Sequence, residues 1–148
     1  MKICLACSPG GHLLQIMQLE DLYKKYDHFF LTFNRRMSKE LLKKERSYFI
    51  KDVKRDILSL ILNFFQSLLV FLIEKPKITI STGAGVTFFI CVLSKLFGGK
   101  VIFIESFSRV NYPSLTGRIV YHLSDLFIVQ WEFLLKFYKK AVYGGSIF

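Results

Sequence analysis

Short runs rich in Ile, Val and Phe alternate with helix-forming stretches along most of the chain, and this alternation limits the possible folds more than any other feature. The runs expected to form strands cover residues 2–7, 28–33, 47–51, 77–81, 100–105 and 126–130. Helical patterns cover residues 12–25, 38–44, 56–74, 86–97, 114–123 and 131–139. Strands joined by helices form right-handed crossovers, so we predict an α/β fold with a Rossmann-like, mostly parallel sheet and helices on both faces.

Three loops lie where such a sheet binds its ligands, beyond the carboxyl ends of the strands. We name them glycine loop 1 (residues 8–12, SPGGH), glycine loop 2 (81–85, STGAG) and the crevice loop (105–109, ESFSR). Glycine-rich turns let backbone N–H groups approach an anion, and two such turns suit a diphosphate. The alternative, that these glycines only permit tight turns, stays open. A chain of 148 residues has room for one domain, so we expect a single domain over 1–148.

Neither glycine loop matches a known nucleotide signature. A P-loop needs a lysine after its glycines, and neither loop is followed by one. A dinucleotide site needs GxGxxG and an acidic residue at the end of the second strand, where this chain has FNRR at 33–36. We therefore expect no cofactor. The cysteines, Cys4, Cys7 and Cys91, lie in apolar runs and are expected to be reduced core residues without a metal. Cys4 and Cys7 would point to opposite faces of a strand.

Two titratable residues of these loops are candidates for proton chemistry. His12 begins the first helical stretch, where a helix N-terminus favours the neutral ring that could act as a general base on a hydroxyl. The alternative is a histidine whose hydrogen bond only fixes the loop. Glu105 ends an apolar strand and would be costly to bury unpaired, so its expected partner is Arg109 or a backbone N–H group. An ordinary exposed carboxylate is the other possibility.

Residues 57–73, ILSLILNFFQSLLVFLI, form the most apolar stretch. As a helix they would span about 26 Å, less than the roughly 30 Å of a hydrocarbon core, so they predict a poor transmembrane span. An apolar helix beside a basic stretch is typical of an interfacial membrane anchor, in which Leu60, Phe64 and Phe71 would contact the bilayer. The alternative is a helix buried between the sheet and a partner subunit. The basic residues are Arg35, Arg36, Lys39, Lys43, Lys44, Arg46, Lys51, Lys54 and Arg55.

A formal net charge of +10 indicates an anionic partner: nucleic acid, a membrane surface or a phosphorylated ligand. No motif for DNA or RNA recognition is present, and the aromatic residues lie in apolar runs instead of among the basic ones. We therefore expect no nucleic acid partner.

Several motifs occur together and in a fixed order. They are SPGGH at 8–12, STGAG at 81–85, FIES at 103–106 with Arg109, SLTGRIVYHLSD at 114–125, VQW at 129–131 and AVYGGSIF at 141–148. With them the chain resembles, nearly end to end, the Alg-fourteen family of oligosaccharide biosynthesis proteins, including its bacterial capsular and exopolysaccharide members. The resemblance implies the N-terminal, acceptor-binding half of a MurG-like GT-B glycosyltransferase, with the donor-binding half on a separate chain.

The resemblance also implies a function. The chain would be a subunit of a two-chain, UDP-sugar-dependent glycosyltransferase, inactive alone, that binds a polyprenyl-diphosphate sugar as acceptor. It would lie peripherally on the cytoplasmic face of the cell membrane and recruit the donor-binding catalytic subunit, which alone binds the nucleotide sugar. His12 and Glu105 would be catalytic. The residues implied to bind the acceptor or its diphosphate are Gly10, Gly11, Thr82, Gly83, Gly85, Ser106 and Arg109.

This chain departs from the family in two places. The eukaryotic members carry an N-terminal transmembrane anchor, whereas this sequence begins at its first strand without an export signal, so we expect any membrane role to fall on residues 57–73. The family loop continues with a proline after STGAG, where this chain has Phe88 and Phe89.

The final segment contains two glycines followed by an apolar pair. We expect Tyr143, Ile147 and Phe148 to contact the partner subunit, because buried apolar anchors often dominate an interface. A frayed tail is the alternative. Two other functions stay open: a membrane scaffold or activator of the partner transferase without a ligand site, and a complete small glycosyltransferase. The single domain argues against a complete enzyme, because transfer in this architecture takes place between two domains.

Overall fold

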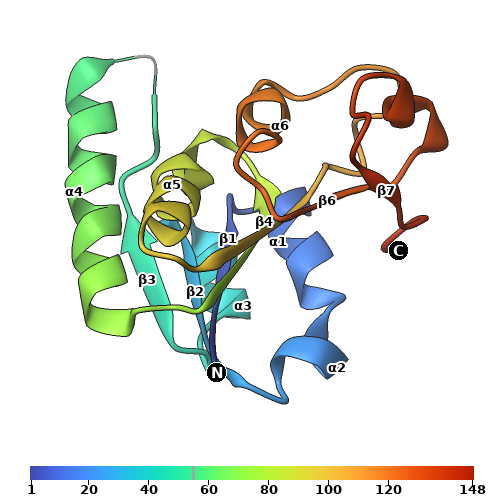
Figure 1. Ribbon diagram of the computed structural model, residues 1–148. Coiled ribbons are helices and arrows are strands. Elements are labelled where there is room, and N and C mark those ends of the chain that lie inside the picture. Colours follow the sequence, from blue (N-terminus) through green and yellow to red (C-terminus); the bar gives the residue numbers. More distant parts are fainter. Residues whose placement is uncertain (55) are drawn as a thin grey trace.

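The computed structural model describes residues 1–54 and 56–148, and within them a seven-stranded parallel sheet forms the centre of the protein (Figure 1). The strand order is β3-β2-β1-β4-β5-β6-β7. The strands are β1 (Lys2–Cys7), β2 (Asp27–Phe33), β3 (Ser47–Ile50), β4 (Ile78–Gly83), β5 (Lys100–Ile104), β6 (Leu126–Val129) and β7 (Val142–Tyr143). The predicted Rossmann-like fold is confirmed.

Helices cover both faces of the sheet, as predicted. The helices are α1 (Gly11–Met17), α2 (Glu20–Tyr23), α3 (Arg36–Leu41), α4 (Ile57–Glu74), α5 (Phe88–Leu96) and α6 (Leu115–Val120), with 3-10 turns η1 (Gly85–Thr87) and η2 (Glu132–Lys136). Side chains of α4, α5, α6 and η2 form one core layer against the sheet, and those of α1, α2 and the end of α3 form the other. Figure 1 shows α4 and α5 on the opposite side of the sheet from α1 and α2.

Beyond shifted ends, the predicted elements differ from the observed ones most clearly at three places. The single helix expected over 12–25 is two helices, because the backbone at Leu19 (φ −90°, ψ 20°) leaves the helical conformation. The helix expected over 131–139 is the shorter 3-10 turn η2, which packs Leu134 into the core. Strand β7 was not predicted, since two residues are too few to give a periodic pattern.

The cysteines are core residues, as predicted. Cys4 packs in the layer under α4 and α5, whereas Cys7 packs in the layer under α1, so the two thiols point to opposite faces of β1. Burial raises the pKa of both Cys7 and Cys91 to about 12, which keeps these thiols protonated.

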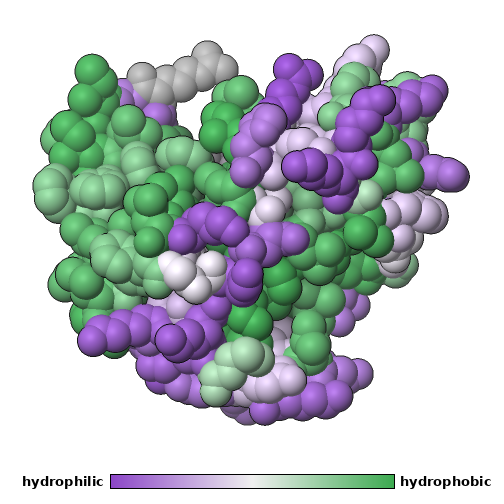
Figure 2. All heavy atoms as spheres, viewed as in Figure 1, coloured by the Kyte–Doolittle hydropathy of each residue, from purple (hydrophilic) through white to green (hydrophobic). Residues whose placement is uncertain are grey.

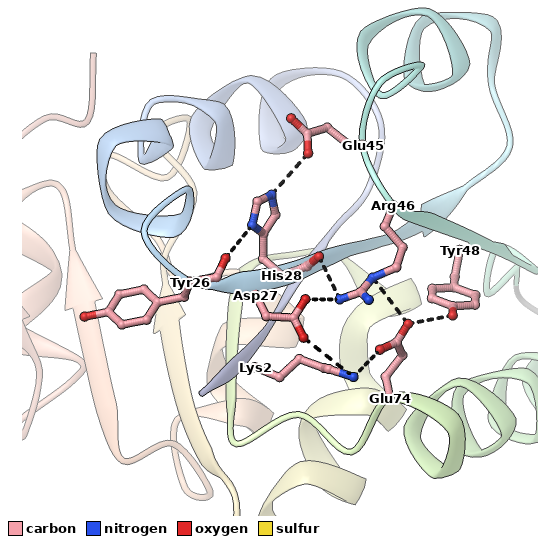
Figure 3. Close-up of polar contacts among 8 residues, drawn as sticks. All are labelled: Lys2, Tyr26, Asp27, His28, Glu45, Arg46, Tyr48 and Glu74. Atoms are coloured by element: carbon pink, nitrogen blue, oxygen red, sulfur yellow. Dashed lines mark hydrogen bonds and ion pairs between the residues drawn. The ribbon is translucent and has the colours of Figure 1, made fainter.

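A cluster of charges closes the amino edge of the sheet, the edge opposite the predicted ligand loops (Figure 3). The carboxylate of Glu74, at the end of α4, accepts hydrogen bonds from Lys2 Nζ (2.8 Å) and Tyr48 Oη (2.6 Å) and lies 3.4 Å from Arg46 Nε. Burial opposes ionisation of Glu74, yet these partners outweigh it and lower its pKa. The cluster ties the end of α4 to β1 and β3, so the whole helix is fixed against the sheet.

Candidate functional site

The strand order reverses between β1 and β4, and this topological switch point is where an open α/β sheet forms its ligand crevice. From β1 the chain continues outward through β2 and β3, and from β4 it continues outward in the other direction. Glycine loop 1 follows β1, and glycine loop 2 comprises the last three residues of β4 and the two residues after them. The two strands are paired neighbours. Both loops therefore border the switch-point crevice at the carboxyl edge of the sheet.

Hydrogen bonds lock the two glycine loops together. His12 Nδ1 donates to the carbonyl oxygen of Thr82 at 2.6 Å, and Thr82 Oγ1 donates to the carbonyl oxygen of His12 at 2.9 Å. Gly83 lies directly against the imidazole: a Cβ atom there would be 3.4 Å from His12 Cε1, and its φ of +108° favours glycine. The close contact and the positive φ explain why a glycine occupies position 83.

The His12 ring is held neutral. Burial is the main cause that lowers its pKa; the Thr82 carbonyl and the charge of Glu105 act in the opposite direction, and Arg109 lowers it further. Because Nδ1 carries the proton donated to Thr82, a neutral ring leaves Nε2 unprotonated and able to accept a proton. The geometry is compatible with both interpretations of His12 from the sequence: Nδ1 fixes the loop by its hydrogen bond, and Nε2 is able to accept a proton.

The glycines of loop 1 leave open space beside the backbone. No atom lies within 4 Å of a Cβ built on Gly10 or on Gly11, and Gly10 has a φ of +93°. In loop 2, Gly85 is exposed, and its nearest neighbour is Val53, at 3.7 Å from such a Cβ. A ligand could therefore approach the main chain of loop 1 closely.

Glu105 is not accessible to a ligand. Its side chain is 1% exposed and accepts hydrogen bonds from the N–H groups of Ser106 (3.0 Å) and Ser114 (3.1 Å) and from Tyr138 Oη (2.7 Å). Gly117 of α6 leaves the space that this carboxylate fills. The predicted backbone partner is confirmed. The burial argues against the predicted catalytic role, because the carboxylate instead joins the crevice loop, the N-cap of α6 and Tyr138.

The other two residues predicted in the crevice loop have different surroundings. Ser106 is 5% exposed, and its hydroxyl lies 3.0 Å from that of Ser108. Arg109 is exposed, and its backbone N–H donates to the carbonyl of Ser106 at 2.9 Å. Arg109 also lines an open hollow of about 330 Å³ with residues 108 and 110–112. Its guanidinium is therefore free to meet a ligand entering from solvent.

Two buried glutamines connect the site in a way that the sequence did not indicate. Gln15 Oε1 accepts from the N–H of Phe107 (3.1 Å) and from Gln130 Nε2 (2.8 Å), while Gln15 Nε2 donates to the carbonyl of Gly11 (3.2 Å). Gln130 Nε2 also donates to the carbonyl of Glu105 at 2.9 Å. The network joins glycine loop 1 to the crevice loop. In the sequence, each glutamine is only a polar residue within or directly after an apolar element: Gln15 lies in α1, and Gln130 follows β6.

Helix α4 buries polar residues and exposes many apolar ones, the reverse of an ordinary amphipathic helix packed on a core. Its polar residues Ser59, Asn63 and Ser67 are buried, where Asn63 Nδ2 donates to the carbonyl of Lys51 at 2.6 Å. Most of its large apolar residues face outward and form, with the end of α5, a surface that we name the apolar face. Figure 2 shows hydrophobic residues gathered over α4 and α5. The exposed residues are Ile57, Leu58, Leu60, Ile61, Leu62, Phe65, Leu69, Leu72, Ile73, Leu96 and Phe97.

The residues predicted to contact a membrane are only partly on this face. Leu60 is exposed, as expected, but Phe64 is half-buried against Phe89, and Phe71 is 6% exposed and belongs to the core. The choice of Phe71 is corrected: it lies one turn from the buried Ser67, on the inner side of the helix. By length and composition α4 could span a membrane, yet a third of its residues are buried against the rest of the fold.

Two arginines of the basic stretch before α4 are paired with carboxylates. Arg46 Nη2 donates to Asp27 (2.5 Å), and Arg36 Nε donates to Glu40 (3.0 Å). Arg55 lies outside the described residues.

The residues predicted to contact a partner differ in exposure. Tyr143, in the edge strand β7, and Phe148 are both more than half exposed. Ile147 instead packs partly against the core, and its N–H donates to Gln130 Oε1 at 3.0 Å. The Phe148 ring lies edge-on to Phe107, with centroids 5.5 Å apart. The tail is therefore tied to the fold at Ile147.

Within the described part of the chain, no cluster of three or more His, Cys, Asp or Glu residues could hold a metal ion.

Solved structures with the same arrangement define the fold class. MurG of Acinetobacter baumannii aligns with a TM-score of 0.72 and 15% identity, over 90% of this chain and 43% of MurG. The UDP-GlcNAc 2-epimerase of Methanocaldococcus jannaschii aligns with a TM-score of 0.75 and 16% identity, over 99% of this chain and 46% of the epimerase. The chain therefore has the Rossmann-like fold of one half of a GT-B protein.

Within that class the family is specific. Residues 3–147 match the family described as "Oligosaccharide biosynthesis protein Alg14 like", and the chain belongs to this family, as its motifs predicted. A relative from Rattus norvegicus, named UDP-N-acetylglucosamine transferase subunit ALG14, is 46% identical over 79 residues, which cover 49% of this chain and 37% of the relative. The subunit of the same name from Kluyveromyces lactis is 40% identical over 78 residues, covering 49% of this chain and 33% of the relative. The match thus spans about a third of the length of these relatives.

Proposed function

We propose that this protein is the acceptor-binding, membrane-associated subunit of a two-chain glycosyltransferase of polysaccharide or lipid-linked oligosaccharide biosynthesis, of the capsular or exopolysaccharide kind. Its acceptor is a sugar linked to a polyprenyl diphosphate. A second chain binds the nucleotide sugar, and the complex forms at the cytoplasmic face of the membrane. The relatives named as transferase subunits support a role that needs a partner chain.

The observation that carries this proposal is the combination of two locked glycine loops with an apolar face that reaches the same edge of the sheet. Helix α4 begins after the carboxyl end of β3 and runs back to Glu74, which pairs with Lys2 at the amino edge. The apolar face therefore starts beside the edge at which the glycine loops lie. A polyprenyl diphosphate has both an anionic group and an apolar chain, so it requires these two kinds of surface together.

In this proposal the residues have distinct roles. His12 Nε2 accepts the proton of the attacking sugar hydroxyl, while Nδ1 keeps the loops aligned. Arg109 meets the charge of the diphosphate, and Glu105 is a positioning residue. The main chain of the glycine loops forms the cradle for the diphosphate. Its remaining members are Gly10, Gly11, Thr82, Gly83, Gly85 and Ser106.

The partner surface lies at the end of the strand order beyond β6. Tyr143 and Phe148 offer exposed aromatic anchors for the donor-binding subunit, and aromatic side chains are enriched among residues that dominate interfaces. Ile147 holds the tail in place instead of entering the partner, because it is already packed against this domain.

Membrane association is tested with the apolar face. The variant Leu58→Ser/Phe65→Ser/Leu69→Ser should bind phosphatidylglycerol vesicles at least about a hundredfold more weakly, since each buried large apolar side chain contributes roughly 1.5–3 kcal/mol. Leu115→Ser/Ile119→Ser/Phe133→Ser removes equally exposed apolar residues elsewhere and should bind as the parent does. Sedimentation with vesicles measures both. Full binding by the first variant would refute the membrane role of α4.

A scaffold without a ligand site is the second candidate, and one observation favours it. The carboxylate of the crevice loop is buried, and one nitrogen of His12 is engaged, so few groups remain for catalysis. Gly83→Ala strains glycine loop 2 and separates the two candidates. Lost transfer activity with an intact complex supports acceptor binding, whereas unchanged activity supports the scaffold.

A further inference from the structure

A small basic hollow lies at the carboxyl ends of β2 and β3, apart from the switch-point crevice. It encloses about 330 Å³ and is lined by Phe33, Asn34, Arg35, Ile50, Lys51, Asp52 and Lys54. We propose that this basic hollow binds the phosphate group of an anionic membrane lipid and thereby sets the orientation of the protein on the bilayer. The inference rests on the proposed membrane role of α4 and adds to it a specific headgroup site.

The charge of the hollow suits a phosphate. Three cationic side chains, Arg35, Lys51 and Lys54, line it together with one carboxylate, Asp52. Among the residues that the structure describes, none of these cations lies within ion-pair distance of a carboxylate, although the nearby Arg46 does. Unpaired cations grouped around a hollow have the charge complementary to a phosphate, and an arginine fork can bind one bidentately.

Neighbouring contacts fix the walls of the hollow. The guanidinium carbon of Arg35 lies 5.2 Å from the centre of the Phe33 ring, within cation–π range. The main chain of Lys51 is held by α4 on both sides: its N–H donates to Gln66 Oε1 at 2.6 Å, and its carbonyl accepts from Asn63 Nδ2 at 2.6 Å. The hollow is therefore attached directly to the helix that carries the apolar face.

Its position favours a lipid over a free phosphate. The chain passes from the hollow into α4, whose first two residues, Ile57 and Leu58, are among the most exposed of the apolar face. A lipid phosphate in the hollow would thus leave its acyl chains beside an apolar surface. The hollow also lies on the edge of the sheet that holds the crevice, two to three strands away, or roughly 10–15 Å at the usual strand spacing. Binding there would bring the crevice to the membrane surface.

The first experiment compares two variants that each lose three positive charges. The hollow variant, Arg35→Gln/Lys51→Gln/Lys54→Gln, removes the three positive charges of the hollow. The control variant, Lys43→Gln/Lys75→Gln/Lys77→Gln, removes exposed cations elsewhere, two of them at the far end of α4. With phosphatidylglycerol vesicles at fixed salt, the hollow variant should bind at least about tenfold more weakly than the control variant. Equal losses would show a diffuse charge effect and overturn the inference, while leaving the membrane role of the apolar face intact.

The second experiment distinguishes the source of the phosphate. NMR follows the backbone amide resonances of residues 33–35 and 50–54 during two titrations. One titration uses glycerol phosphate, and the other uses the short-chain lipid dihexanoyl phosphatidylglycerol. The lipid should bind at least about tenfold more tightly than glycerol phosphate. Asp52→Asn should raise the affinity for both ligands, because it removes a negative charge that repels the phosphate. Equal affinities for the two ligands would mean a site for free phosphate and overturn the lipid assignment, as would no shift with either.

Discussion

The contact between His12 and Thr82 sets what the switch-point crevice can do chemically. A histidine on a flexible loop would exchange between tautomers and charge states, but here the Thr82 carbonyl at 2.6 Å accepts only from a protonated Nδ1. Burial then disfavours a second proton on the ring. The unprotonated Nε2 is the form that a general base requires near neutral pH.

This contact predicts how stability depends on pH. Because the pKa of His12 is lower in the folded than in the unfolded chain, the unfolded chain binds more protons below about pH 6.5. The free energy of unfolding should therefore fall as the pH drops from about 6.5 towards the folded pKa, and His12→Gln should reduce that fall. Urea unfolding at pH 7 and pH 5 and an NMR titration of the ring measure the effect; a ring that titrates at 6.5 or above would contradict it.

Residue roles could be predicted where topology alone decides them. The meeting of His12 with Thr82 follows from their places just after β1 and at the carboxyl end of β4, which any parallel sheet of this order brings together. The identity of the distant partners of Glu105 could not be foreseen, because Ser114 and Tyr138 are 9 and 33 positions away along the chain. Such contacts depend on how η2 and α6 pack, which no local pattern encodes.

At the scale of elements, α6 is positioned by a buried polar cluster. Its N-cap, Ser114, accepts the N–H of Gly117 at 2.8 Å and donates its own N–H to Glu105. A Cβ atom at Gly117 would lie 2.2 Å from Glu105 Oε2 and 2.8 Å from Tyr138 Oη. The helix can approach β5 this closely only because position 117 has no side chain.

Replacing Gly117 by alanine should therefore destabilise the protein, even though alanine has the higher helix propensity. Alanine gains about 1 kcal/mol over glycine inside a helix, but displacing Glu105 leaves buried donors unpaired at about 1–3 kcal/mol each. We expect a net loss of about 2–3 kcal/mol in the free energy of unfolding, measured by urea denaturation. Gly11→Ala, in α1 with open space around it, is the matched control and should be neutral or slightly stabilising. A Gly117→Ala protein as stable as its parent would show that α6 shifts freely.

Helix α4 shows what periodicity can and cannot establish. The sequence pattern places the polar residues Ser59, Asn63, Gln66 and Ser67 on one stripe. The structure buries three of them but leaves Gln66 exposed, where its Oε1 accepts the N–H of Lys51. The pattern alone could not tell which face is buried, and the usual rule would put the apolar side inward. The buried amide of Asn63 resolves this, since it bonds the loop after β3 and, at 3.4 Å, the carbonyl of Val86 beside glycine loop 2. These polar contacts leave the apolar residues on the surface.

At the scale of the whole molecule, the chain matches one half of larger proteins. It covers 43% of MurG and 46% of the epimerase, whose remaining residues have no counterpart in this chain. The crevice of this half is open above Gly10 and Gly11, and the exposed ring of Phe148 lies beside Phe107 of the crevice loop. A second domain would have to close the crevice for sugar transfer to take place in a site sheltered from water.

The last prediction follows from the proposed two-chain function. The isolated chain should transfer no sugar and should bind UDP-N-acetylglucosamine weakly or not at all, because the proposed donor site belongs to the other chain. Adding a donor-binding partner chain should produce activity. Phe148→Ala should weaken that association about tenfold or more, since a lost apolar anchor of 1.5–3 kcal/mol corresponds to at least that factor. Isothermal titration calorimetry of the two chains measures the affinity, and circular dichroism checks the fold of the variant. Ile147→Ala is the contrasting variant: it should lower the stability of this domain, because Ile147 packs against its own core. Turnover by the isolated chain would exclude the two-chain mechanism, and unchanged affinity of Phe148→Ala would exclude the tail from the interface.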